Sequence, residues 1–180
     1  MTDTTVRSLH DIGLAAWFGG SLMGAIGLNG AAASVSDPTE RAKTASTGWA
    51  RWAPVNAAAI GAHLIGGAGV VKANRKRIAS QSGVGAATSA KTILTGAALV
   101  TTAYAGYMGT KVGIDHQPAQ GATEPSAATP NETAAGQERL KALQWAIPVL
   151  TGAVLVLNSF MGEQQRPSSV ASGLLDRVRN

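Results

Sequence analysis

The sequence contains no cysteine, few aromatic residues and few charged residues. The missing cysteines exclude disulfide bonds, zinc–thiolate sites, cysteine nucleophiles and iron–sulfur clusters held by cysteine. Aromatic residues make up 4% of the chain and charged residues 14%, whereas a soluble domain usually carries about 25% charged residues. The shortage of charge therefore favours a protein whose middle part lies in lipid.

The usual motifs of soluble enzymes are also missing. The sequence has no P-loop, no H-E-x-x-H zinc motif and no G-x-S-x-G nucleophile elbow. No Asp, Glu, Lys or Arg falls in the middle of a long apolar stretch, although ion-coupled transporters normally need such residues on their pathway. We therefore expect neither an enzyme with catalytic residues nor a self-contained ion-coupled transporter.

What the sequence does contain is long uncharged stretches, of which residues 52–71 are the clearest. A helix of this length crosses a bilayer core of about 30 Å at about 1.5 Å per residue. Lys72, Arg75, Lys76 and Arg77 follow directly. Because Lys and Arg are retained on the cytoplasmic side, this basic cluster fixes the orientation of the stretch.

Three further stretches can be arranged around this one, which predicts an all-α, integral membrane four-helix bundle formed by a single domain of residues 1–180. The predicted spans are 12–35, 52–71, 92–110 and 143–161. The distribution of Lys and Arg favours a multi-pass protein of the cell membrane with both termini in the cytoplasm. Ala31–Ala33 also resembles a signal-peptide cleavage site, but the apolar stretch is longer than usual for a signal peptide, which favours a retained span.

Two segments lie outside the predicted spans. Residues 112–140 are rich in Ala, Pro, Thr, Gln and Glu and lack large apolar residues after Ile114, so we expect a disordered outer linker. Residues 168–180 form a cytoplasmic tail. Its apolar residues recur at helical spacing, which is typical of a short interfacial helix.

Glycines are frequent inside the predicted spans. Small residues let helix backbones approach closely in a membrane, where no hydrophobic drive brings helices together. We interpret Gly20, Gly24, Gly66 and Gly67 as helix-packing positions. Packing within the bundle is the leading interpretation, and a homo-oligomer or docking onto a larger membrane complex is the alternative.

Three polar residues are candidates for function: His10, His63 and Asn56. His63 is the only ionisable residue predicted deep in a span, and such residues are often functional. The alternative is a neutral imidazole that hydrogen-bonds a neighbouring helix. With the first span at 12–35, His10 and His63 differ in depth by roughly 15 Å. This predicts no shared metal or haem site and no cofactor, unless the first span is shifted by several residues.

The net charge of +5 favours an anionic partner. The basic cluster at Lys72, Arg75, Lys76 and Arg77 adjoins an apolar stretch, so anionic lipid headgroups are a better partner than nucleic acid.

Residues 9–20, Leu-His-Asp-Ile-Gly-Leu-Ala-Ala-Trp-Phe-Gly-Gly, resemble the first span of bacterial copper-resistance-D-like proteins and related uncharacterised four-span families. Those proteins often show Leu-His, then Trp, a large apolar residue and a Gly pair. Their Met- and His-rich copper ligands are not evident here, because Met23, Met108 and Met161 are scattered in depth. The Ala/Gly-rich style is similar to that of actinobacterial membrane proteins. The resemblance implies a membrane bundle and carries no activity across.

The sequence thus predicts a small membrane protein with a structural or accessory role, such as a subunit of a larger membrane complex. The alternative is a small-molecule or metal carrier that uses His63 and His10. A ligand bound by the isolated bundle would favour the carrier.

Overall fold

The computed structural model describes residues 3–80, 82–114 and 116–163 of the chain. The described part is helical apart from two connecting segments. Its elements are α1 (Asp3–Met23), the π-helical η1 (Gly24–Leu28), α2 (Asn29–Ala33), α3 (Arg41–Ser80), α4 (Ser82–Ile114) and α5 (Asn131–Glu163). The tail predicted at 168–180 lies outside the described residues.

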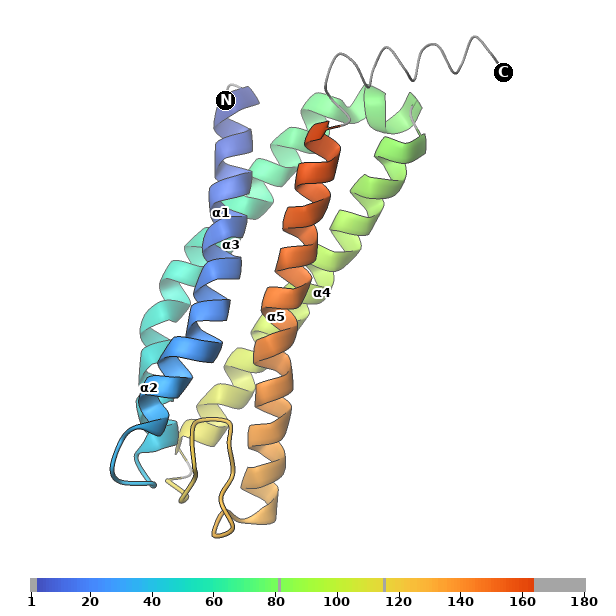
Figure 1. The fold of residues 1–180 in the computed structure, drawn as a ribbon. Helices are drawn as coiled ribbons and strands as arrows, with labels where there is room; N and C mark the ends of the chain where they lie inside the picture. Colours follow the sequence, from blue (N-terminus) through green and yellow to red (C-terminus); the bar gives the residue numbers. More distant parts are fainter. Residues whose placement is uncertain (1–2, 81, 115, 164–180) are drawn as a thin grey trace.

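The helices form an up-and-down bundle in which α1, η1 and α2 act as one continuous helical segment (Figure 1). The start of α1, the junction of α3 with α4, and the end of α5 lie at one end, which we call the basic end because Lys72 and Arg75 lie near it. The connections at 34–40 and 116–130 lie at the other end, which we call the loop end (Figure 1). This alternation confirms the predicted all-α bundle.

Two helix pairs build the bundle. The packing of α1 is most extensive against α3, and that of α4 against α5. The largest fully buried apolar side chains include Leu14 and Trp17 from α1 and Val154 from α5. These side chains join the two pairs, because they belong to one cluster that also includes Ala98 of α4.

Three helical stretches are long and apolar enough to cross a membrane: Thr4–Ala33, Arg41–Arg75 and Asn131–Gly162. They contain three of the four predicted spans almost entirely. The fourth predicted span, 92–110, lies within α4, which is not among the three. Threonines, glycines and tyrosines in this part of α4 lower its mean hydropathy.

The helices are longer than the predicted spans, and the difference matters most at the first. α1 begins at Asp3, about nine residues before the predicted start at Ile12. An acidic residue in the first turn suits the positive end of a helix dipole, so the polar leader continues the helix. His10 and Asp11 are therefore inside the helix, two turns from its start.

The segment predicted as a disordered linker is ordered where it is described. Residues 131–140 belong to α5, and residues 116–130 fold back onto the loop end. Ala119, Ala122 and Thr123 are buried. Arg41 donates hydrogen bonds to the carbonyls of Ala119 and Gln120, at 3.0 and 3.1 Å. The composition suggested disorder because large apolar residues are missing, but small side chains and bound carbonyls anchor this loop instead.

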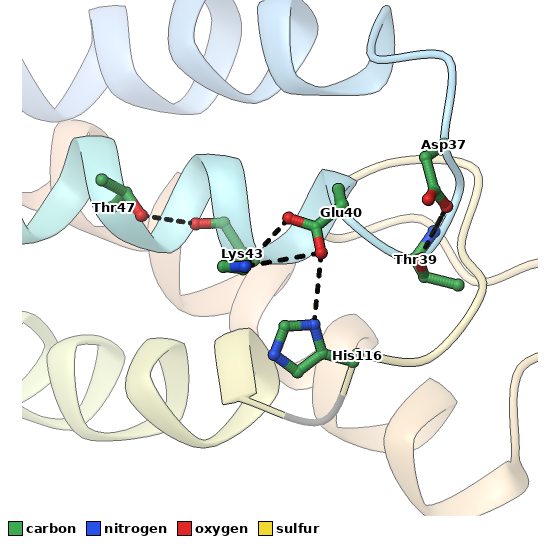
Figure 2. A network of polar contacts seen from close by, with 6 residues as sticks. All are labelled: Asp37, Thr39, Glu40, Lys43, Thr47 and His116. Atoms are coloured by element: carbon green, nitrogen blue, oxygen red, sulfur yellow. Dashed lines mark hydrogen bonds and ion pairs between the residues drawn. The ribbon is translucent and has the colours of Figure 1, made fainter.

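Glu40 links the two connections at the loop end (Figure 2). Its carboxylate lies 3.1 Å from the Lys43 ammonium and 3.5 Å from Nδ1 of His116. Nearby, the Asp37 carboxylate accepts hydrogen bonds from the backbone N–H and the hydroxyl of Thr39, which lowers the pKa of Asp37. His116 therefore belongs to the loop end and lies far from the other two histidines.

Candidate functional site

Glycines hold α1 and α3 in close contact and set the register between them. A side-chain carbon added at Gly66 would lie 2.4 Å from the backbone nitrogen of His10. One added at Gly13 would lie 2.4 Å from the carbonyl oxygen of Ala59 and 2.5 Å from the backbone nitrogen of His63. Only glycine allows backbones to approach this closely. The seam brings the backbone of His10 beside that of His63.

The four predicted packing glycines lie along this seam. Gly20 packs on the indole of Trp52, and Gly24 on the indole of Trp49. Gly66 contacts the α1 backbone, and Gly67 faces the imidazole of His10. These contacts are made within the chain.

His10 and His63 form a buried, stacked pair. Their ring centroids are 4.1 Å apart and their planes differ by 16°. Nδ1 of His10 lies 3.0 Å from the carbonyl oxygen of His63, and Nδ1 of His63 lies 3.0 Å from the carbonyl oxygen of His10. A carbonyl oxygen only accepts hydrogen bonds, so both Nδ1 atoms carry a proton. Because these reciprocal bonds use the two Nδ1 atoms, the two Nε2 atoms remain available for contacts with other groups.

The predicted difference in depth between His10 and His63 is wrong. Because α1 starts about nine residues earlier than the predicted span, His10 lies roughly 13 Å deeper in the bundle than expected, at about 1.5 Å per residue. This shift removes nearly the whole predicted difference in depth between the two histidines. The hydrogen bond from His63 to a neighbouring helix, which was the alternative to a functional role, is present: its partner is the carbonyl of His10 on α1.

Lys91 of α4 completes this cluster. Its Nζ lies 3.0 Å from Nε2 of His10. Because Nδ1 of His10 already carries a proton, the simplest assignment is that the ammonium donates to the Nε2 lone pair of a neutral imidazole. In the described part of the chain Lys91 forms no ion pair. Asp11 is the acidic residue close enough for its negative charge to interact with Lys91. With this assignment the Lys91 ammonium is held here without a bonded carboxylate.

Two more residues enclose the pair. Trp17 lies edge-on to His63, with ring centroids 6.2 Å apart, and its Nε1 donates to the Thr102 hydroxyl at 3.1 Å. Asn158 of α5 lies near His10, and neither polar atom of its buried side chain has a hydrogen-bond partner among the described residues.

The cluster lies in the wall of a cavity of about 360 Å³ between α3 and α4, which we call the inner cavity. Its polar wall includes His10, His63 and Lys91, and most of the remaining wall is apolar. Ligand pockets are typically about 300–1,000 Å³, mostly apolar, with a few polar groups that orient the ligand. The inner cavity has these properties.

Asn56, the third predicted candidate, lies elsewhere. It lines a second cavity of about 420 Å³, nearer the loop end, which we call the outer cavity. Leu99 of α4 contributes to the walls of both cavities. The three predicted candidates are therefore divided between two sites.

Sequence reasoning did not place Lys91 in the His10–His63 cluster, because Lys91 precedes the apolar stretch at 92–110. The available signal was its separation from the main basic cluster by more than ten uncharged residues.

The described residues contain no group of three or more His, Cys, Asp or Glu side chains arranged to hold a metal ion. Comparison of the chain with family models, with curated proteins and with solved structures gives no match. Function must therefore be argued from the site itself.

Proposed function

We propose that this protein is a four-span membrane carrier that binds a small anionic amphiphile in the inner cavity. The observation that carries the proposal is the convergence of Lys91 and the His10–His63 pair on the wall of a mostly apolar cavity. An acidic headgroup would pair with Lys91, and the apolar tail would lie against α3 and α4.

Membrane insertion is supported by the apolar surface of the bundle. Large apolar side chains on every long helix point outward, among them Ile12, Ile65, Ile93 and Val149, each more than 60% exposed. Three helices have the length and hydropathy of spans, and α4 accompanies them over its whole length (Figure 1). We propose that all four cross the membrane, with the basic end in the cytoplasm against anionic headgroups.

The charge of the cavity favours an anion. The Lys91 ammonium has three N–H donors, and one is used by His10. No acidic side chain lines the inner cavity among the residues that the structure describes. A cation held in an apolar site without a bonded counter-ion is costly, and a bound carboxylate would offset much of this cost through charge-assisted hydrogen bonds.

The metal-carrier alternative is less well supported. A metal ligand needs an open imidazole lone pair, and that of His10 faces the Lys91 ammonium. A cation at this position would also repel a metal ion.

The proposal can be tested with a photoreactive fatty acid and the purified protein in lipid nanodiscs. We expect saturable labelling of the inner cavity that unlabelled fatty acid competes. Lys91→Met should weaken binding about ten- to a hundredfold, because a hydrogen bond to a charged group contributes about 1.5–3 kcal/mol.

Lys72→Met is the matched control, because Lys72 is an exposed lysine of α3 near the same end and does not line the cavity. The methyl ester of the fatty acid controls for the charge of the ligand. Equal binding of acid and ester, or equal binding by Lys91→Met and the wild type, would contradict the proposal. Stoichiometric copper lost on His63→Leu would instead favour the metal carrier.

The second candidate function is an accessory subunit of a membrane complex. It is favoured by the outer face of α4, where Ile93 and Val100 are exposed. An exposed apolar face of this kind suits contact with another membrane helix. Co-purification at native expression level tests this candidate: a stable partner supports it, and an isolated bundle that retains the fatty acid favours the carrier.

A further inference from the structure

The outer cavity differs from the inner one in its charge. It lies between α3 and α4 in the half of the bundle nearer the loop end, and α1 and α5 also contribute to its wall. Alanine and glycine make up much of the wall, and none of the described residues that line it is charged. An ionic headgroup would have no counter-charge there, so the chemistry of this cavity suits an uncharged molecule.

Two polar atoms in the wall of this cavity lack partners. Nε1 of Trp52 and Oδ1 of Asn56 are buried and form no hydrogen bond with the described residues. Both residues line the cavity and lie one helical turn apart on α3. An indole N–H can only donate and an amide oxygen can only accept. The wall therefore presents one unused donor and one unused acceptor on the same face of a helix.

Trp49 provides a comparison on the same helix. It lines the same cavity, but its Nε1 donates to Oδ1 of Asn29 at 3.0 Å. Asn29 in turn donates from Nδ2 to Oε1 of Gln144 at 2.6 Å. The N–H of Trp49 is thus hydrogen-bonded to a chain of amides that reaches α5, whereas the N–H of Trp52 has no partner among the described residues.

The indole of Trp52 is held in place by the helix seam. It packs against Gly20 of α1, where an added side-chain carbon would lie 2.0 Å from the ring. Rotation of the ring toward α1 to find another acceptor is therefore blocked. The ring thus stays in the wall of the outer cavity.

We propose that the outer cavity is a second binding site, which takes an uncharged amphiphile with a hydroxyl headgroup, such as a long-chain alcohol. The hydroxyl oxygen accepts a hydrogen bond from Trp52, and its O–H donates one to Asn56. The apolar chain occupies the alanine-lined space toward Leu99. This site is separate from the one at Lys91 and recognises a neutral headgroup.

A photoreactive fatty alcohol tests this proposal with the full-length protein in nanodiscs. We expect it to label peptides of the outer cavity, with competition by the unlabelled alcohol. Trp52→Phe keeps the aromatic packing on Gly20 and removes only the N–H, and it should weaken labelling up to about tenfold. Asn56→Leu should have a similar effect by removing the acceptor. Lys91→Met should leave labelling by the alcohol unchanged.

The methyl ether of the alcohol retains an acceptor oxygen but has no O–H. It should therefore bind to the wild type more weakly than the alcohol does. In the Asn56→Leu variant, the ether and the alcohol should bind equally well. Trp145→Phe is the matched control, because Trp145 is an exposed tryptophan of α5 that is not among the residues lining this cavity. Size-exclusion profiles establish that each variant folds. Equal labelling by alcohol and ether in the wild type, or no effect of either Trp52→Phe or Asn56→Leu, would overturn the proposal and leave the cavity to water or lipid chains only.

Discussion

Trp49 and Trp52 are tryptophans of the same helix and line the same cavity, but their indole N–H groups differ in hydrogen bonding. The N–H of Trp49 is the first link of a chain through Asn29 to Gln144, and that of Trp52 has no partner in the part of the chain that the structure describes. A buried polar group left without a partner costs about 1–3 kcal/mol, whereas removal of an already unpaired group has no such cost. The two indoles therefore contribute differently to the stability of the free protein.

We predict that Trp49→Phe lowers the free energy of unfolding by about 1–3 kcal/mol, because it leaves Oδ1 of Asn29 unpaired in the bundle. Trp52→Phe should leave the stability of the ligand-free protein unchanged or slightly raised. Denaturant titration of the detergent-solubilised protein measures both values. An equal loss in the two variants would show that Trp52 has a partner in the free protein.

The histidine pair shows how much a site depends on register. Each ring is fixed by the carbonyl of the other histidine, so neither side chain can be placed without the facing helix. A one-turn slip of α1 along α3, about 5.4 Å, would break both bonds and separate the rings. The site is therefore a property of the α1–α3 seam.

At the scale of helices, the seam depends on glycines whose neighbours are backbone atoms. Beside Gly66 these are the nitrogen of His10 and the carbonyl oxygen of Val6, neither of which can move without the whole helix. Gly61, on the same helix, has no atom within 4 Å of an added carbon. Two glycines of one helix thus face different surroundings.

We predict that Gly66→Ala destabilises the bundle by about 1–3 kcal/mol, as overpacking does, and also displaces His10 from His63. Gly61→Ala should stabilise it by up to about 1 kcal/mol, because alanine is the better helix former. Unfolding in SDS measures the stability, and binding of the fatty acid measures the state of the site.

Equal stability of the Gly66→Ala protein and the wild type would contradict the close backbone contact between α1 and α3 at this seam. Gly13→Ala provides an independent test from the α1 side, since its added carbon would meet the backbone of Ala59 and His63.

The π-helical segment contributes to the same packing. The backbone N–H of Asn29 bonds to the carbonyl of Gly24, five residues earlier, which widens one turn of the helix. Asn29 is buried immediately after this turn and contacts both Trp49 and Gln144. The wider turn thus precedes the amide chain that satisfies Trp49.

At the scale of the molecule, the loop end and the basic end differ. The loop end is covered by the ordered segment 116–130, whereas the basic end carries Lys72 and Arg75. Basic residues near the end of a membrane helix remain in the cytoplasm. The proposed orientation therefore places the inner cavity in the cytoplasmic half of the membrane.

We predict that a cysteine at Ala79 is labelled from the cytoplasm and one at Ala127 from outside. Both positions are exposed, and the absence of native cysteine removes any background. Labelling of intact cells with a membrane-impermeant maleimide, before and after permeabilisation, measures the two accessibilities. The reversed pattern would overturn the orientation, and labelling of both from outside would require an even number of crossings between them.

The sequence by itself determined the helical class, the helix-packing role of the glycines and the apolar stretches. It did so because local composition fixes these properties: a long uncharged stretch favours a helix, and a glycine in it offers a smooth surface. It also marked His10, His63 and Asn56 as unusual. The order of residues 112–140 could not be predicted in this way, because it depends on Arg41 of α3 and Gln137 of α5, which donate hydrogen bonds to the carbonyls of Ala119 and Gly121.

Only the tertiary structure decided which polar residues meet. His10 and His63 come together because α1 starts near Asp3 and because glycine contacts set its register on α3. Lys91 joins them from a third helix, while Asn56 faces a different cavity with Trp52. The physical reason is that depth and register depend on contacts between helices, whereas composition and periodicity describe one helix at a time.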